Sequence, residues 1–163
     1  MHLDYKLCCS LLSALVLSRI DFCTAVLTGC SKQELKKLQR IIDHAKALAI
    51  RCSKSKDAND SPSLWFGVEK RIALRQSLLV HTALHTKEPI YLAQLLLYPT
   101  STRSLRGHDS CMLYIPKFRT EKARGMFSYA AASTWNRIPA DVRKVGVRPI
   151  FREAIVEWLN KCH

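Results

Sequence analysis

Residues 31–52 read SKQELKKLQRIIDHAKALAIRC, and this stretch decides the fold class. Its apolar residues recur at alternating spacings of three and four, which is the pattern of an α-helix with one buried face. The predicted buried face comprises Leu35, Leu38, Ile42, Ala45, Ala49 and Cys52, with Ile41 and Leu48 widening it. Ser31 and Glu34 form a capping box, in which each side chain satisfies a free backbone N–H at the start of the helix. We therefore expect one amphipathic helix that begins directly after Ser31.

A second helix is predicted immediately upstream, over residues 5–28. Its apolar residues lie close to the helical period and are Leu7, Leu11, Leu12, Leu15, Val16, Cys23, Val26 and Leu27. We expect a single helix with a kink near Ser18. Gly29 is expected to end it, because glycine readily adopts the backbone conformation that follows a helix C-terminus.

The remaining sequence also favours helices. Helices are predicted over residues 69–86, from Pro89 through Leu96, over residues 121–135, and from Pro149 onwards. One extended segment is predicted at residues 111–115. The predicted fold class is therefore mainly α, with at most one or two short strands.

A polar stretch divides the chain. Residues 53–63 (SKSKDANDSPS) contain almost no apolar side chain, so we interpret them as a solvated linker. This gives three predicted parts, which are a helical segment (1–52), the linker (53–63) and a helical C-terminal region (64–163).

Composition limits the class of protein. Of the 163 residues, 48% are hydrophobic, which is enough for a packed core and argues against general disorder. No apolar run reaches the roughly 18 residues that a membrane span needs, because Ser18 and Arg19 interrupt the only long candidate. The seven cysteines lack the spacing of a disulfide framework, and no signal peptide is recognisable at the start. We therefore expect an intracellular protein, in the nucleus or cytoplasm, that is not secreted and not bound to a membrane.

The formal net charge is +13 and is unevenly distributed. Residues 1–31 are neutral overall, whereas residues 32–56 hold eight basic and two acidic residues, and residues 117–152 hold nine and two. The aromatic residues in the second basic region are Phe118, Phe127, Tyr129 and Trp135, of which Phe127 and Trp135 also suit a packing face. Cations neutralise phosphates and exposed rings stack on bases, so this combination favours a nucleic-acid partner. A solvated basic face without a ligand remains the alternative for each single residue.

The sequence offers little of what an enzyme needs. The acidic residues are dispersed, with no Asp-Asp pair, and no cysteine stands in a recognisable nucleophile turn. Asp21 lies two residues after Arg19 on a predicted helix, where an exposed ion pair is the expected role. We predict no catalytic residues.

Two pairs of residues have the spacing of metal ligands. His81 and His85 lie one helical turn apart, and His108 and Cys111 have H-x-x-C spacing. Neither pair has a second pair at ligand spacing, so buried cysteine and core-edge histidine are the favoured interpretation. We predict no metal site and no cofactor in this chain.

An ordered series of short motifs covers nearly the whole chain. In order they are Leu17–Cys23 (LSRIDFC), Leu38–Arg40 (LQR), Leu64–Val68 (LWFGV) with Arg71–Ile72, Thr82–His85 (TALH) with Pro89–Leu92 (PIYL), Arg103–Arg106 (RSLR), Phe127–Ala131 (FSYAA), Trp135–Pro139 (WNRIP) and Phe151–Arg152. Each motif alone is weak. Their joint order and spacing resemble the C-terminal region of non-LTR (LINE-type) retrotransposon reverse transcriptases. The family commonly has a Trp-Leu-Pro-like sequence where this chain has Trp65-Phe66-Gly67.

The resemblance implies a fragment of an RNA-directed DNA polymerase. The family's catalytic aspartates hold two Mg²⁺ ions in the palm domain and include a Tyr- or Phe-x-Asp-Asp signature, which this sequence lacks. The Mg²⁺ would therefore belong to a palm domain, and the chain is not expected to be active alone. The implied fold is a thumb-like helical bundle that grips the template and primer backbone, followed by a smaller helical C-terminal region.

Two groups of cations are the candidate nucleic-acid-binding residues under this resemblance. The first group is Lys32, Lys36, Lys37 and Arg40, and the second is Arg103, Arg106, Lys117, Arg119, Lys122 and Arg124. Their contacts to RNA or DNA are expected to be independent of sequence.

Two other functions remain open from the sequence. One is a stand-alone basic helical protein that binds RNA or DNA, including one domesticated from such an element. The other is a helical protein-interaction scaffold, in which the apolar stripe from Leu35 to Cys52 packs on a partner helix. The oligomeric state is not determined by the sequence.

Overall fold

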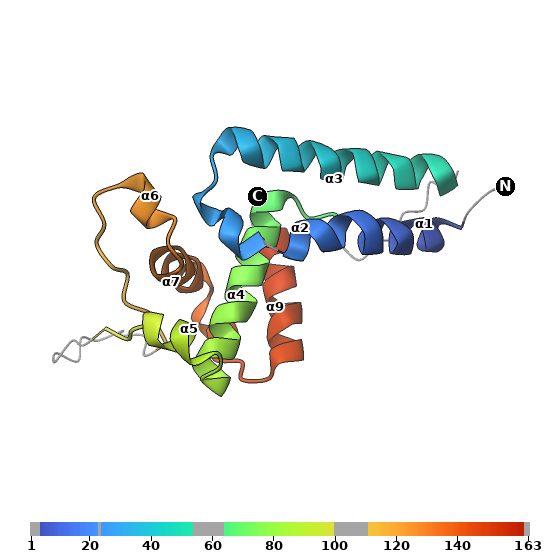
Figure 1. Ribbon diagram of the computed structural model, residues 1–163. Coiled ribbons are helices and arrows are strands. Elements are labelled where there is room, and N and C mark those ends of the chain that lie inside the picture. Colours follow the sequence, from blue (N-terminus) through green and yellow to red (C-terminus); the bar gives the residue numbers. More distant parts are fainter. Residues whose placement is uncertain (1–3, 23, 54–63, 100–110, 162–163) are drawn as a thin grey trace. The chain divides into compact units, whose positions relative to one another are not determined.

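The computed structural model describes residues 4–22, 24–53, 64–99 and 111–161 (Figure 1). All regular secondary structure in these ranges is helical, and none of their residues forms a strand, which confirms the prediction of a mainly α fold. The internal contacts divide the chain into two compact units, Met1–Ile72 and Ala73–His163. The predicted linker lies outside the described residues, apart from Ser53.

The first unit is built on two helical segments that lie side by side (Figure 1). The upstream segment consists of α1 (Tyr5–Leu12), a π-helical turn (Ser13–Leu17), α2 (Ser18–Phe22) and a 3₁₀ turn (Thr24–Gly29). The downstream segment is α3 (Lys32–Ser53). The predicted capping box is confirmed: Ser31 N donates to Glu34 Oε2 at 3.0 Å, and Glu34 N donates to Ser31 Oγ at 3.3 Å. The upstream segment ends at Gly29, as predicted.

The π-helical turn replaces the kink expected near Ser18. A π turn takes in one residue more than an α turn, so it rotates the following residues back by about one position around the helix. With this shift Leu17 and Ile20 join Tyr5 and Cys9 on the buried face, and Leu17 is only 1% exposed. In an uninterrupted α-helix Leu17 would lie away from the buried face, which is why the helical period alone did not predict its burial.

The core of the first unit joins both helical segments to the residues that precede and open α4 (Val68–Thr86). Its buried members are Leu17, Ile20, Ile42, Val68 and Ile72, and a smaller cluster beside it contains Tyr5, Cys9 and Ala49. Leu64 and Trp65 pack against both clusters. The inner face of α3 thus packs on its own unit, which does not favour the alternative of an interaction scaffold in which this face packs on a partner helix.

Several residues predicted to be buried are exposed. Ile41 and Leu48 flank the inner face of α3, and each is nearly half exposed. Leu7, Leu11, Leu15 and Val26 of the upstream segment are also exposed. Apolar spacing alone did not distinguish the buried face of this segment from its outer face.

In its described residues, 73–99 and 111–161, the second unit holds most of α4 and five further helices. These are α5 (Ile90–Leu95), α6 (Glu121–Arg124), α7 (Phe127–Arg137), α8 (Ala140–Arg143) and α9 (Arg148–Lys161). The single helix predicted over 121–135 is two helices, separated at Gly125 and Met126, and α8 was not predicted. Pro89 precedes α5 as its N-cap rather than its first residue. The expected break before Pro139 is confirmed, since α7 ends at Arg137.

The core of the second unit is centred on Phe151, which is fully buried on α9. Its ring centroid lies 4.2 Å from that of His81 on α4 and 5.7 Å from that of Trp135 on α7. Ile155 and Leu159 continue the predicted apolar face of α9 and are buried. Three helices of this unit therefore meet at one aromatic cluster.

The predicted extended segment at 111–115 is not part of a strand, and it is held by side chains of α7 and by one backbone hydrogen bond, which Tyr114 N donates to Leu97 O at 2.7 Å. Leu113 N donates to Asn136 Oδ1, and Asn136 Nδ2 donates to Leu113 O, both at 2.8 Å. The indole Nε1 of Trp135 donates to Cys111 O at 2.8 Å. Trp135 and Asn136, two consecutive residues of α7, therefore hold this segment through three hydrogen bonds.

Candidate nucleic-acid interface

The first candidate group lies on the solvent side of α3. Lys32, Lys36, Lys37 and Arg40 are all exposed, and the buried residues Ile42, Ala45 and Ala49 occupy the other side of the helix. The capping box places the first of these lysines at the start of α3. The helix thus presents four cations to solvent along its first three turns.

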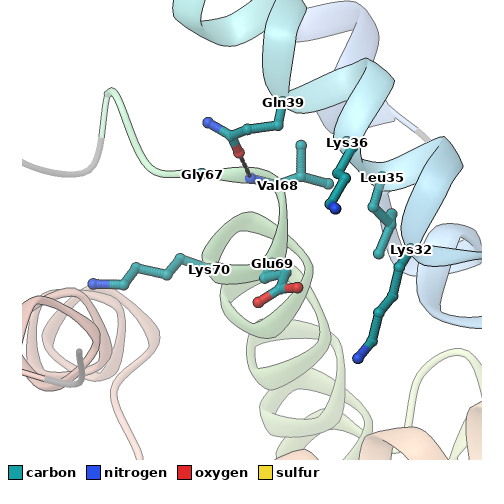
Figure 2. Close-up of a pocket in the computed structure, with 8 residues that line it drawn as sticks. All are labelled: Lys32, Leu35, Lys36, Gln39, Gly67, Val68, Glu69 and Lys70. Atoms are coloured by element: carbon teal, nitrogen blue, oxygen red, sulfur yellow. Dashed lines mark hydrogen bonds between the residues drawn. The ribbon is translucent and has the colours of Figure 1, made fainter.

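Two of these cations line a cavity of about 390 Å³ in the first unit (Figure 2). Its lining residues are Lys32, Leu35, Lys36, Gln39, Gly67, Val68, Glu69 and Lys70. Figure 2 shows Lys32 and Lys36 extending from α3 alongside the first turn of α4. Lys37 and Arg40 are exposed but do not line this cavity. The structure therefore brings half of the first group together with the start of α4.

Gln39 joins the two walls of the cavity. Its Oε1 accepts a hydrogen bond from Val68 N at 2.9 Å (Figure 2). Its Nε2 donates to Asp43 Oδ1 at 2.8 Å. A Cβ atom at Gly67 would lie 2.9 Å from Gln39 Oε1, so the end of the Gln39 side chain would have to shift. The absence of a side chain at position 67 thus leaves room for the Gln39 amide beside Val68 N.

The cavity lies at the N-terminal turn of α4. The first N–H groups of a helix have no partner inside the helix, and the helix dipole makes that end attractive to anions. Gln39 takes the N–H of Val68, and the next residues of this turn are Glu69 and Lys70. The carboxylate of Glu69 opposes an anion here, so the cavity combines three lysines with one acidic side chain.

Lys70 is a cation that the sequence analysis did not select. Its Nζ lies 5.8 Å from the centroid of the Phe66 ring, within cation–π range, and the side chain points away from Lys32 and Lys36 (Figure 2). It lies on α4, 34 positions after Lys36, and outside both basic regions. Only its position near the predicted start of this helix, three residues after Gly67, could have identified it.

The second candidate group is described only in part. Arg103 and Arg106 lie outside the described residues. Lys117, Arg119, Lys122 and Arg124 belong to the second unit, and all four are exposed. Thr120 caps α6, with its Oγ1 accepting from Ala123 N at 3.3 Å, so Lys122 and Arg124 sit on a short, capped helix. The four residues form a local basic segment rather than a cavity.

The aromatic residues of this region mainly pack within the unit. Trp135 is 1% exposed, which confirms its expected core role. Phe118 and Tyr129 are partly buried, and their ring centroids lie 6.3 Å apart. Their rings therefore contact each other rather than standing free for base stacking, and the inference of nucleic-acid binding depends on the cations.

His81 is a buried titratable residue of the second unit, and its contacts are structural. His81 Nε2 lies 2.8 Å from Val145 O, a carbonyl that can only accept, so the ring carries its proton on Nε2. Burial lowers the pKa of His81 below the ordinary 6.5, with smaller contributions from His85 and Arg148. His81 is therefore neutral near pH 7.

A second cavity, of about 490 Å³, lies beside α8 and α9. Its lining residues include Asp141, Glu157 and Lys161. Lys161 Nζ lies 2.7 Å from Glu157 Oε1, and this hydrogen bond lowers the pKa of Glu157 below its ordinary value. A carboxyl group with a lowered pKa is not suited to act as a general acid near neutral pH.

No group of three or more His, Cys, Asp or Glu side chains in the described ranges could hold a metal ion. Among the helices the structure describes, none has the length and apolar character needed to cross a bilayer.

Comparisons with known proteins give no relative. No protein-family model, no curated protein and no solved structure matches the chain.

Proposed function

We propose that the chain binds the phosphate backbone of RNA or DNA, independently of base sequence, through the basic face of α3 and the cavity beside it. The observation that supports this most is the cavity itself, in which Lys32 and Lys36 of α3 lie next to the first turn of α4. Lysines neutralise phosphate charge, and helix N-termini present backbone donors to anions. The geometry therefore suits a phosphate group better than an uncharged ligand.

The rest of the basic face extends the proposed contact. Lys37 and Arg40 are exposed on the same helix, outside the cavity, where they reach further phosphates along a strand. The described part of α3 offers no exposed aromatic side chain for base stacking, so the contacts are to the backbone. Such contacts supply affinity and position without base readout.

The proposed origin of the chain rests on the sequence resemblance alone. We propose a C-terminal, thumb-like fragment of a non-LTR retrotransposon reverse transcriptase that acts inside the cell, in the nucleus or cytoplasm. The missing Tyr- or Phe-x-Asp-Asp signature supports a binding role without polymerase activity. Primer extension by the purified chain with Mg²⁺ should give no product, and measurable DNA synthesis would overturn this part of the proposal. A stand-alone nucleic-acid-binding protein would show the same binding without an upstream palm-encoding reading frame.

The binding experiment measures fluorescence anisotropy of labelled single-stranded RNA and duplex DNA over a range of salt concentrations. The proposal expects log K to fall linearly with log[salt], with a slope of about −0.9 for each duplex phosphate neutralised. Lys32→Gln/Lys36→Gln should weaken binding to all sequences alike and make the slope shallower by about two phosphates. The matched control, Lys6→Gln/Lys87→Gln, removes the same charge from exposed positions outside both candidate groups. Equal loss in both double variants would contradict a local site.

Removing the acidic residue of the cavity is a second test, and it should change the affinity for nucleic acid in the opposite direction. Glu69→Gln removes the only negative charge among the lining residues and should raise affinity for both nucleic acids. Glu153→Gln is the matched control on the exposed surface of α9. If both substitutions raise affinity equally, overall net charge rather than the cavity determines binding.

A further inference from the structure

The outer face of the upstream helical segment carries an apolar stripe. Leu7, Leu11 and Leu15 follow one another at intervals of four, and they are 50%, 46% and 69% exposed. Phe22, further along the same segment, is 88% exposed. Clustered exposed apolar side chains of this kind mark interaction surfaces, whereas scattered ones do not. We call the three leucines, Leu7, Leu11 and Leu15, the outer stripe.

The outer stripe is a second apolar face of a helix whose other face is already buried. Tyr5, Cys9, Leu17 and Ile20 pack into the core of the first unit. The π-helical turn sets the register of both faces, because it brings Leu17 inward and keeps Leu15 in line with Leu11 on the outside. A helix that is apolar on two faces is typical of one covered on both.

The low charge of this segment indicates which kind of partner covers the outer stripe. Within residues 4–22, Asp21 pairs with Arg71, and the remaining Lys6, Arg19 and Asp4 leave a charge of +1 in a chain of net charge +13. A nucleic acid or an anionic surface gains little by contacting an apolar face that carries so few cations. Two copies of a strongly basic chain repel each other least where segments of low charge meet.

We propose that a second copy of this chain docks on the outer stripe, forming an antiparallel helix pair with its two-fold axis near Leu11. Around this axis Leu7 of each copy faces Leu15 of the other. Asp4 then comes opposite Ser18 of the other copy, beside Arg19, so opposite charges meet at both ends of the pair. The second copy thus finds complementary charges as well as an apolar face.

This inference is independent of the proposed nucleic-acid binding, and the two respond oppositely to salt. Salt screens the repulsion between the basic copies, so dimerisation through an apolar face of low charge strengthens as salt rises. Backbone binding weakens over the same range. Failure of one proposal is therefore distinguishable from failure of the other.

The first test is sedimentation equilibrium of the whole chain at low and high salt. A monomer–dimer equilibrium that shifts toward dimer in high salt is expected. Leu15→Glu should raise the dimer dissociation constant at least about tenfold, because each interface then buries two unpaired carboxylates. Ile150→Glu, at a 55% exposed position of α9 between Arg148 and Arg152, is the matched control and should leave the equilibrium unchanged. Far-ultraviolet circular dichroism and nucleic-acid affinity of both variants should equal those of the parent chain.

A cross-linking test examines the antiparallel register. Leu11→Cys places two thiols near the axis and should form an intermolecular disulfide under mild oxidation with oxidised glutathione, which is reduced to two thiols as the bond forms. Two copies of Leu7→Cys should not cross-link to each other, because their thiols would lie about 12 Å apart along the direction of the helices. Cross-linking at both positions would show a parallel pair and contradict the register. A chain that stays monomeric at all concentrations, or a Leu15→Glu variant that dimerises like the parent, would overturn the inference.

Discussion

Arg71 and Asp21 form an ion pair that joins the start of α4 to the end of α2, with Arg71 Nη1 2.8 Å from Asp21 Oδ1. The arginine side chain is 7% exposed and the aspartate side chain 20%. Arg71 Nε also donates to Phe66 O at 2.9 Å, and Nη2 donates to Leu64 O. One guanidinium group therefore holds α2 and the segment before α4 together, 50 residues apart in sequence.

Removing the carboxylate should destabilise the first unit. Asp21→Ala leaves a largely buried guanidinium without its counter-ion, so we expect a loss of about 2 kcal/mol in the free energy of unfolding. Arg71→Ala should cost more, because it also leaves two backbone carbonyls without their donor. Urea unfolding measures both. The control is Glu157→Ala in the exposed Glu157–Lys161 pair, where no measurable change is expected. Equal effects at the two pairs would contradict the role given to Arg71.

The hydrogen bonds of Asn136 lead to a second prediction. Asn136→Ala leaves the N–H and C=O of Leu113 without a partner, at a cost of about 2 kcal/mol in the free energy of unfolding. The segment around residue 113 should also become more sensitive to limited proteolysis. Asn160→Ala, on the exposed surface of α9, is the control and should change neither measurement.

The close approach of Gln39 to Gly67 leads to a third prediction. In Gly67→Ala the new methyl group would displace Gln39 Oε1 and break its hydrogen bond with Val68 N, so we expect a loss of about 1 kcal/mol in urea unfolding. Gly146→Ala is the matched control, because a Cβ there meets its nearest neighbour, His85, at an ordinary 3.8 Å. A harmless Gly67→Ala would show that Gln39 moves aside freely.

Local signals in the sequence were enough to predict much of the helical structure. The capping box at Ser31 and the apolar period of α3 depend on residues within a few positions of each other, and the structure confirms both. The fold class and the extent of α4 followed in the same way. The basic face of α3 was predicted for the same reason, because residues spaced by three and four share one side of a helix.

Contacts between distant residues could not be predicted. Asp21 was expected to form an exposed pair with Arg19, but it pairs with Arg71, whose place depends on how α2 and α4 pack. The cavity depends in the same way on Gln39 meeting Val68, so Lys70 was missed. The π-helical turn was missed as well, since its benefit is the burial of Leu17 in a core that the sequence does not display.

The buried imidazole of His81 leads to a prediction about pH. Because burial lowers the pKa of His81 in the folded chain below 6.5, the unfolded chain binds more protons as the pH falls through this value. The free energy of unfolding contributed by His81 is therefore full above about pH 6.5 and declines below it. His81→Gln lacks this titration, so the stability difference between the parent and this variant should narrow as the pH is lowered from 7.5 toward about 5. His44→Gln, at an exposed position on α3, is the control substitution. If the parent and His81→Gln lose stability in parallel, the carboxyl groups and not His81 determine the acid response.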